Sequence, residues 1–174
     1  MAGPKHDGAA GTGFWEFSLK LYGRPKVAPA CLRLQDRHRL DVNLILLCCY
    51  AGCAGYGAFT AAELRRADRA ISAWRRQVVE PLRAARRALK SQPLRRADAL
   101  RRRVLAAELE GEAVAQALLE RWLKARGRRP TGIAAEDSAA SLARYALFAR
   151  PRLGRSGRAD LDAILAAAAS LAAR

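Results

Sequence analysis

Four polar residues that could bind a ligand lie together between two apolar segments of the chain. Gln35 and Asp36 end one segment, and Asp41 and Asn43 begin the next. Two carboxylates and two amides offer the oxygen ligands that Mg²⁺ prefers, and a magnesium ion held there could bind a diphosphate. All-helical isoprenoid-type enzymes use paired aspartate-rich motifs in this way, whereas this chain has one such cluster. A metal-dependent enzyme or a ligand-binding protein built on Asp36 and Asp41 is therefore an alternative interpretation.

The same polar cluster has a structural interpretation, which we prefer. Asp41 is a suitable helix N-cap, because its carboxylate can accept the free N–H groups of Asn43 or Leu44. Asp36 would end the preceding helix, while Gln35 and Asn43 would satisfy buried polar groups of the backbone. The sequence therefore predicts no catalytic residue, no metal site and no cofactor.

The cysteines offer a second possible metal site. All four lie in apolar surroundings and none forms a CxxC pair: Cys31, Cys48, Cys49 and Cys53. The two histidines, His6 and His38, leave few ligands to complete a tetrahedral zinc site. We therefore expect reduced thiols that pack as small core residues, and we find no Ser/His/Asp set or Gly-rich phosphate loop.

A strong basic excess is the main indication of a partner. The formal net charge is +16, and such an excess attracts nucleic acid, anionic lipid or acidic proteins. Six basic residues repeat at helical spacing between residues 61 and 90, namely Arg65, Arg69, Arg76, Arg83, Arg87 and Lys90. Such a row could follow a line of phosphates, or it could be the solvated flank of a packed helix.

The elements that must position these residues are helical. Ala, Leu and Arg dominate, and no segment alternates convincingly with period two, so we predict an all-α, single-domain bundle. It should contain about six or seven helices around a buried central helix at about 42–57. We expect a flexible N-terminus at 1–12 and a helical core domain at 13–125. Residues 126–174 should form basic loops and two C-terminal helices that could pack on the core.

Two segments of the core should form an antiparallel hairpin. The segment 61–90 should divide where Pro81 starts a new helix near Glu80, and a long helix should follow at about 94–125. The acidic middle of the long helix could then meet arginines of the preceding one. Its apolar seam is predicted at Leu100, Val104, Ala107, Gly111, Val114, Leu118, Arg121 and Trp122.

An uncharged run from Leu44 to Ala62 is long enough to raise the question of a membrane span. Thr60 and Glu63 form a capping-box pattern that would start a new helix inside the run. About 14 residues remain before Gly57, or roughly 21 Å of helix, which is short of a ~30 Å hydrocarbon core. We therefore prefer a buried helix, with membrane association as an alternative, and expect a cytoplasmic protein because no apolar leader is present.

Three short motifs resemble a known family. FWEFSL with LY (14–22), ACL with LQD (30–36) and DVNL (41–44) are similar to the signature of a small, mainly proteobacterial family catalogued as a domain of unknown function. The resemblance implies a helical, intracellular bacterial protein without an assigned activity. In that pattern a glycine commonly follows Gln-Asp. Arg39 stands near that place here, which argues against a turn with positive φ.

We conclude from the sequence that a non-enzymatic interaction module is the preferred function. Its basic helical face would meet an anionic partner, either nucleic acid or an acidic protein. An enzyme using the Asp36/Asp41 cluster and a membrane-associated protein are the alternatives.

Overall fold

The computed structural model describes residues 13–91, 95–129, 132–149 and 153–172. Residues 1–12, with the predicted flexible start and His6, lie outside these ranges. The regular elements in the described ranges are all helical, which confirms the predicted class. They are α1 (Phe14–Tyr22), α2 (Val27–His38), α3 (Val42–Cys53), α4 (Ala61–Trp74), η1 (Arg75–Val79), α5 (Glu80–Lys90), α6 (Arg95–Arg126), α7 (Ala134–Phe148) and α8 (Arg155–Ala172).

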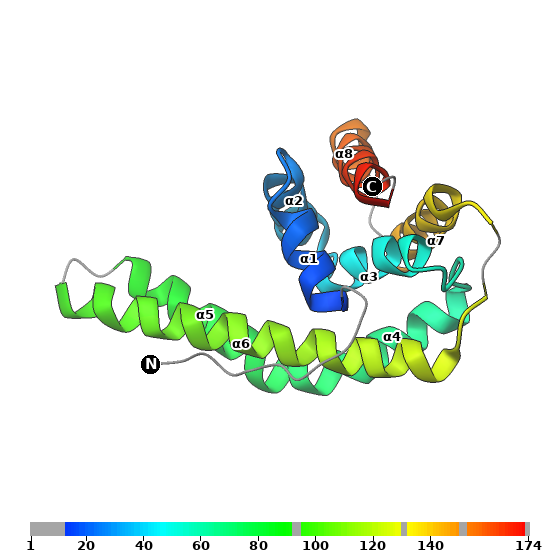
Figure 1. Ribbon diagram of the computed structural model, residues 1–174. Coiled ribbons are helices and arrows are strands. Elements are labelled where there is room, and N and C mark those ends of the chain that lie inside the picture. The colour runs from blue at the N-terminus through cyan, green and yellow to red at the C-terminus, as the bar shows by residue number, and fades with distance from the viewer. Residues whose placement is uncertain (1–12, 92–94, 130–131, 150–152, 173–174) are drawn as a thin grey trace.

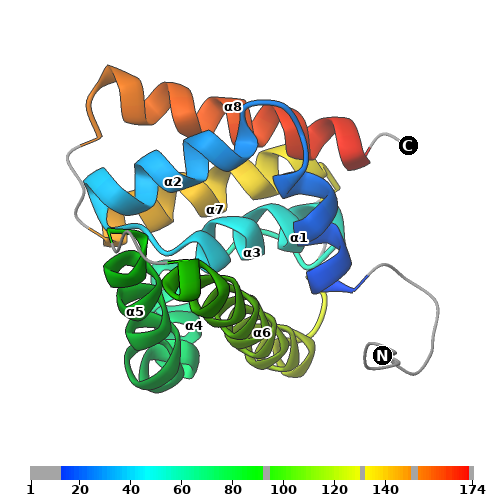
Figure 2. The ribbon, with the colours of Figure 1, turned by 90° about the vertical axis from the view of Figure 1, so that its left-hand side faces the viewer.

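The helices form two groups (Figures 1 and 2). The long helix α6 runs back along α4, η1 and α5, as the predicted hairpin requires. The other helices lie on one side of this layer, and α5 with the first part of α6 extends beyond them. The two C-terminal helices pack on the rest of the chain, α7 against α3 and α8 against α2.

Helix α3 is at the centre of the group formed by α1, α2, α3, α7 and α8. Every residue from Asn43 to Gly52 is buried, and the segment has no charge to solvate. The helix ends at Cys53, so the predicted extent of about 42–57 is too long. Gly55 and Gly57 explain the early end, because their φ angles of 72° and 76° are left-handed and cannot continue a right-handed helix. Among the helices of the described ranges, we find none with the length and hydropathy needed to cross a membrane.

The segment 61–90 divides as predicted, and the division also changes which residues share a face. The five residues of η1 form a π-helix, and α5 then begins at Glu80 with Pro81 in its first turn. A π turn holds more residues than an α turn, so helix faces before and after it no longer align. The predicted basic row from Arg65 to Lys90 is therefore not one continuous stripe.

The predicted seam of α6 is wrong in part. Leu100 and Val114 were expected inside, yet their exposed fractions are 46% and 41%. The buried residues are Ala97, Glu108, Gly111, Ala115, Gln116, Leu119 and Leu123. Two of them are polar residues whose partners lie on other helices, so apolar spacing alone selects the wrong face.

Arg39 corrects a second expectation. It ends α2 with a φ of 57°, so the left-handed turn is present although the residue is not glycine. Its N–H donates to Gln35 O at 3.0 Å, and the Leu40 N–H donates to Leu34 O at 3.3 Å. These bonds satisfy the last carbonyls of α2 and offset the strain of about 1 kcal/mol or more that a side chain brings to this conformation.

A buried ion pair joins the start of α4 to the end of α6. The predicted capping box is present, since Thr60 Oγ1 accepts from the Glu63 N–H and Glu63 Oε2 accepts from the Thr60 N–H. Arg126 Nε lies 2.7 Å from Glu63 Oε1, and their side chains are 6% and 10% exposed. Burial by itself raises the pKa of Glu63, but hydrogen bonds from Arg126 and Thr60 outweigh it and hold that pKa at about 2.

This low pKa predicts acid sensitivity. The folded-state pKa of Glu63 lies below the ordinary value of about 4.3, so its stabilisation is complete above that value and is lost as pH falls towards 2. We expect Glu63→Gln to cost on the order of 2–3 kcal/mol of unfolding free energy at pH 7 and much less near pH 2. Urea unfolding of both proteins at the two pH values checks this. An equal cost at both values would contradict it.

Candidate functional site

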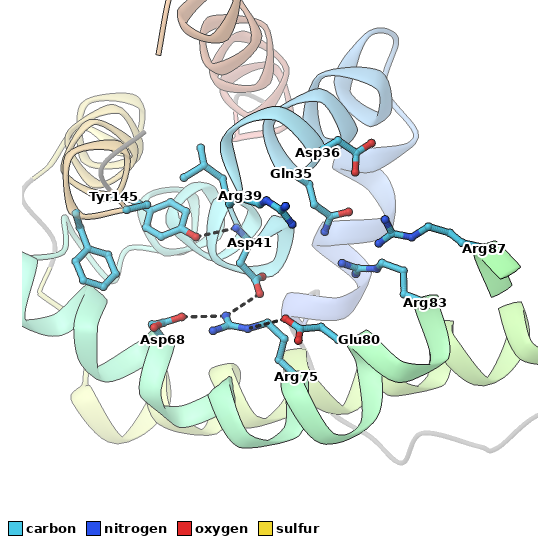
Figure 3. Close-up of a pocket in the computed structure, with 13 residues that line it drawn as sticks. Gln35, Asp36, Arg39, Asp41, Asp68, Arg75, Glu80, Arg83, Arg87 and Tyr145 are labelled. Atoms are coloured by element: carbon cyan, nitrogen blue, oxygen red, sulfur yellow. Dashed lines mark hydrogen bonds and ion pairs between the residues drawn. The ribbon is translucent and has the colours of Figure 1, made fainter. Parts of the chain in front are cut away.

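A polar cleft of about 680 Å³ opens beside the turn between α2 and α3 (Figure 3). Its other walls come from α4, η1 and α5 on one side and from the end of α7 on the other. The lining residues are Gln35, Asp36, Arg39, Leu40, Asp41, Asp68, Arg75, Glu80, Arg83, Arg87, Tyr145, Phe148 and Ala149. The cleft therefore brings together part of the predicted polar cluster and part of the predicted basic row.

Asp41 has the capping role that its position predicts. Its Oδ1 accepts from the Asn43 N–H at 2.8 Å and from the Leu44 N–H at 3.3 Å. Its own N–H donates to Tyr145 Oη at 2.8 Å, which ties the turn to α7. Burial raises the pKa of Tyr145, and the nearby Asp41 carboxylate adds to the effect, so this phenol stays protonated.

Arg75 gathers the carboxylates on one side of the cleft. Its Nη1 lies 2.9 Å from both Asp41 Oδ2 and Asp68 Oδ1, and its Nε lies 4.0 Å from Glu80 Oε1. Burial alone would lower the pKa of Arg75, but Asp41 and Asp68 outweigh burial and raise it. This side of the cleft, which we call the carboxylate end, is internally paired.

The opposite side, the arginine end, consists of Gln35, Arg39, Arg83 and Arg87. Arg83 is anchored by α6, where it bonds Glu112 Oε1 at 2.5 Å and Glu108 Oε1 at 3.4 Å. Arg39 and Arg87 are exposed, and neither forms an ion pair with a carboxylate of the described residues. Figure 3 shows these side chains around one end of the cleft, with the Gln35 amide among them.

The predicted polar cluster is not brought together as a metal site. The Asp41 carboxylate already accepts from two backbone N–H groups and pairs with Arg75, and Asp36 is exposed. Asn43 lies outside the cleft and bonds to α6 instead, donating to Glu112 Oε2 at 2.6 Å and accepting from Gln116 Nε2 at 2.9 Å. In the described part of the chain, no group of three His, Cys, Asp or Glu residues is placed to hold a metal ion.

The predicted basic row is divided by the fold. Arg83 and Arg87 line the cleft, whereas Arg65, Arg69, Arg76 and Lys90 are exposed and do not line it. The acidic middle of α6 does meet arginines of α5, since Glu108 also bonds Arg86 Nε at 2.5 Å. The Glu108 side chain is only 8% exposed, so this pair is more buried than a surface ion pair.

The cysteines are free thiols. Cys31, Cys48 and Cys49 are buried and Cys53 is partly buried. Burial raises the pKa of Cys31 to about 12, so it is a poor nucleophile and a poor metal ligand.

Three cleft residues were not predicted as site residues from the sequence, namely Asp68, Arg75 and Tyr145. Asp68 and Arg75 are two turns apart, a spacing that places opposite charges near one face and could have suggested the pair. Tyr145 had no such signal, because its partner is a backbone N–H on another helix.

The comparisons with known proteins supply a family. Residues 13–119 match the family described as "Protein of unknown function (DUF2390)". The chain belongs to this family. No curated protein and no solved structure matches this chain. The DUF2390 match covers α1 to most of α6, and so includes the arginine end of the cleft, while Tyr145 lies beyond it.

Proposed function

We propose that this DUF2390 protein is a cytoplasmic, non-enzymatic interaction module. It binds an anionic partner, nucleic acid or an acidic protein, with the arginine end of the cleft as the main contact. The observation that carries the proposal is the pair of guanidinium groups of Arg39 and Arg87, which no carboxylate of the described residues pairs with and which lie beside the anchored Arg83. Planar guanidinium groups suit phosphate and carboxylate oxygens, which they can bind with two parallel hydrogen bonds.

The distribution of charge matters more than its sum in the cleft. The lining holds four arginines and four carboxylates, but Asp41, Asp68 and Glu80 all face Arg75. The fourth carboxylate, Asp36, is exposed and is outnumbered by the three guanidinium groups of the arginine end. An incoming anion therefore finds donors at the arginine end, where Gln35 can add an amide N–H. The net charge of +16 would draw a polyanion to the molecule before these groups contact it.

The proposal predicts a local loss of binding. We expect the double variant Arg39→Gln/Arg87→Gln to weaken binding of the preferred oligomer at least tenfold at moderate salt. Fluorescence anisotropy of labelled single-stranded RNA, DNA and polyglutamate, titrated at several salt concentrations, measures this. For the wild type, log affinity for a nucleic acid should fall linearly with log salt.

A matched control variant distinguishes specific binding at the arginine end from non-specific electrostatic attraction. Arg65→Gln/Arg69→Gln removes the same charge from exposed positions outside the cleft. We expect it to weaken binding no more than two- to threefold. An equal loss of affinity in both variants would mean that binding arises from non-specific electrostatic attraction and not from the cleft. No binding of any probe at low salt would overturn the proposed function.

A further inference from the structure

A second hollow, which we call the groove, lies on the other side of Gln35 and Arg83, among α1, α2, α3, α5 and α6. Its volume is about 370 Å³, within the range of small-molecule sites. Four exposed leucines line it, with exposed fractions of 56% for Leu19, 48% for Leu32, 38% for Leu105 and 54% for Leu109. Trp15 adds a half-buried aromatic wall. Apolar side chains from separate helices thus converge on a space that no part of the described chain fills.

Two buried polar atoms of the groove residues have no hydrogen-bond partner among the described residues. They are Ser18 Oγ and Gln116 Oε1, and both residues are 3% exposed. In the described part of the chain, no other buried side-chain oxygen or nitrogen is left in this state. Each such atom costs free energy until it finds a partner. Because both residues line the groove, a molecule bound there can supply the missing partners as neighbouring side chains adjust.

The charges that line the groove indicate an uncharged ligand. They are two arginines and two glutamates, and they already pair with one another, Arg83 with Glu108 and Glu112 and Arg86 with Glu108. Burial raises the pKa of Glu112 even though Asn43 and Arg83 bond its carboxylate. A charged ligand would therefore lose its hydration without finding an unpaired opposite charge among the described lining residues, whereas a neutral molecule would not.

We propose that the groove binds a small, uncharged, mainly apolar molecule that carries a hydroxyl or another hydrogen-bond donor. Its apolar part lies on Trp15 and the four exposed leucines. Its donor group donates to Gln116 Oε1, and where that group is a hydroxyl its oxygen accepts from the Ser18 O–H. This site is distinct from the arginine end of the cleft, although Gln35 and Arg83 line both hollows.

A pair of probes tests the hydrogen-bond requirement. 2-Naphthol has an apolar ring system and a hydroxyl donor, and 2-methoxynaphthalene has the same rings without the donor. We expect 2-naphthol to bind the full chain saturably and at least tenfold more tightly than 2-methoxynaphthalene. The leucine methyl NMR signals of Leu19, Leu32, Leu105 and Leu109 should shift on binding. Equal affinity for the two probes would overturn the donor's role.

Three variants test whether the probe binds in the groove. Ser18→Ala removes an unsatisfied buried hydroxyl, so its melting temperature should not fall, yet its preference for 2-naphthol should shrink at least threefold. Leu109→Glu at the rim should abolish binding. Leu100→Glu, on the same helix but outside the groove, should leave binding unchanged.

Several results would overturn the proposal. One is an unchanged affinity in Leu109→Glu, and another is an unchanged preference in Ser18→Ala. A third is the absence of saturable methyl shifts with either probe, which is the result expected if the exposed leucines instead cover a helix of a partner protein. Arg39→Gln/Arg87→Gln should bind 2-naphthol normally, so failure of this site is distinguishable from failure of the proposed function.

Discussion

Replacing Arg126 with alanine is expected to lower the free energy of unfolding by about 3 kcal/mol, since the buried Glu63 carboxylate loses its buried partner and keeps only the exposed Arg129. The side chains of Arg126 and Glu63 are 6% and 10% exposed, so solvent replaces the lost guanidinium poorly. Chemical denaturation followed by circular dichroism measures the change.

The loss extends beyond the ion pair. Arg126 Nη1 donates to Tyr56 O at 2.5 Å, and its Nη2 donates to Ala58 O at 3.1 Å. The guanidinium also lies over the Phe59 ring, 5.0 Å from its centroid. One side chain thus holds the connection between α3 and α4 in place through hydrogen bonds to two of its carbonyl groups.

Arg129 provides the matched control. It bonds the same Glu63 Oε1 at 3.2 Å, but its side chain is 64% exposed. Arg129→Ala should therefore cost no more than about 1 kcal/mol. Adding Glu63→Gln to Arg126→Ala should recover part of the loss, because the buried carboxylate that has lost its buried guanidinium partner is removed. Similar costs for the two arginine variants would contradict the buried-pair explanation.

Local signals in the sequence predicted most helix positions. Glycine and proline bounded α1, the Asp41 cap began α3, and the Thr60/Glu63 box began α4. These signals act within a few residues, so they can be read without the fold. The buried face of α6 could not be read in this way. Glu108 and Gln116 lie inside because Arg83, Arg86 and Asn43 meet them from other helices.

The candidate site shows the same limit. Gln35, Asp36 and Asp41 were grouped by their closeness in sequence, and Arg83 and Arg87 by helical spacing. Only the fold, which places the α2–α3 turn across the cleft from α5, brings the two groups together. The π-helix at Arg75–Val79 is a further reason, since it rotates α5 relative to α4 and separates Arg83 and Arg87 from the arginines before it.

Gly52→Ala is expected to destabilise the protein by about 3 kcal/mol, the upper part of the usual range for overpacked sites. Helix α3 meets α7 at this residue. A Cβ added at Gly52 would lie 2.5 Å from Ala134 O and 2.7 Å from Ser138 N, and it would also collide with Ser138 Oγ. Because two of these atoms belong to the backbone, α7 itself must move, and the hydrogen bond from Ser138 Oγ to Cys49 O is strained or lost.

Gly111 gives the opposite expectation within the same protein. It lies inside α6, and a Cβ there would meet Val79 and Leu82 side chains at 3.6 and 3.8 Å, which is ordinary contact. Gly111→Ala should therefore stabilise the protein by roughly 0.5–1 kcal/mol, the gain of alanine over glycine inside a helix. Thermal and urea unfolding of the two variants measure both effects. If Gly52→Ala were also neutral or stabilising, the close contact between α3 and α7 would be wrong.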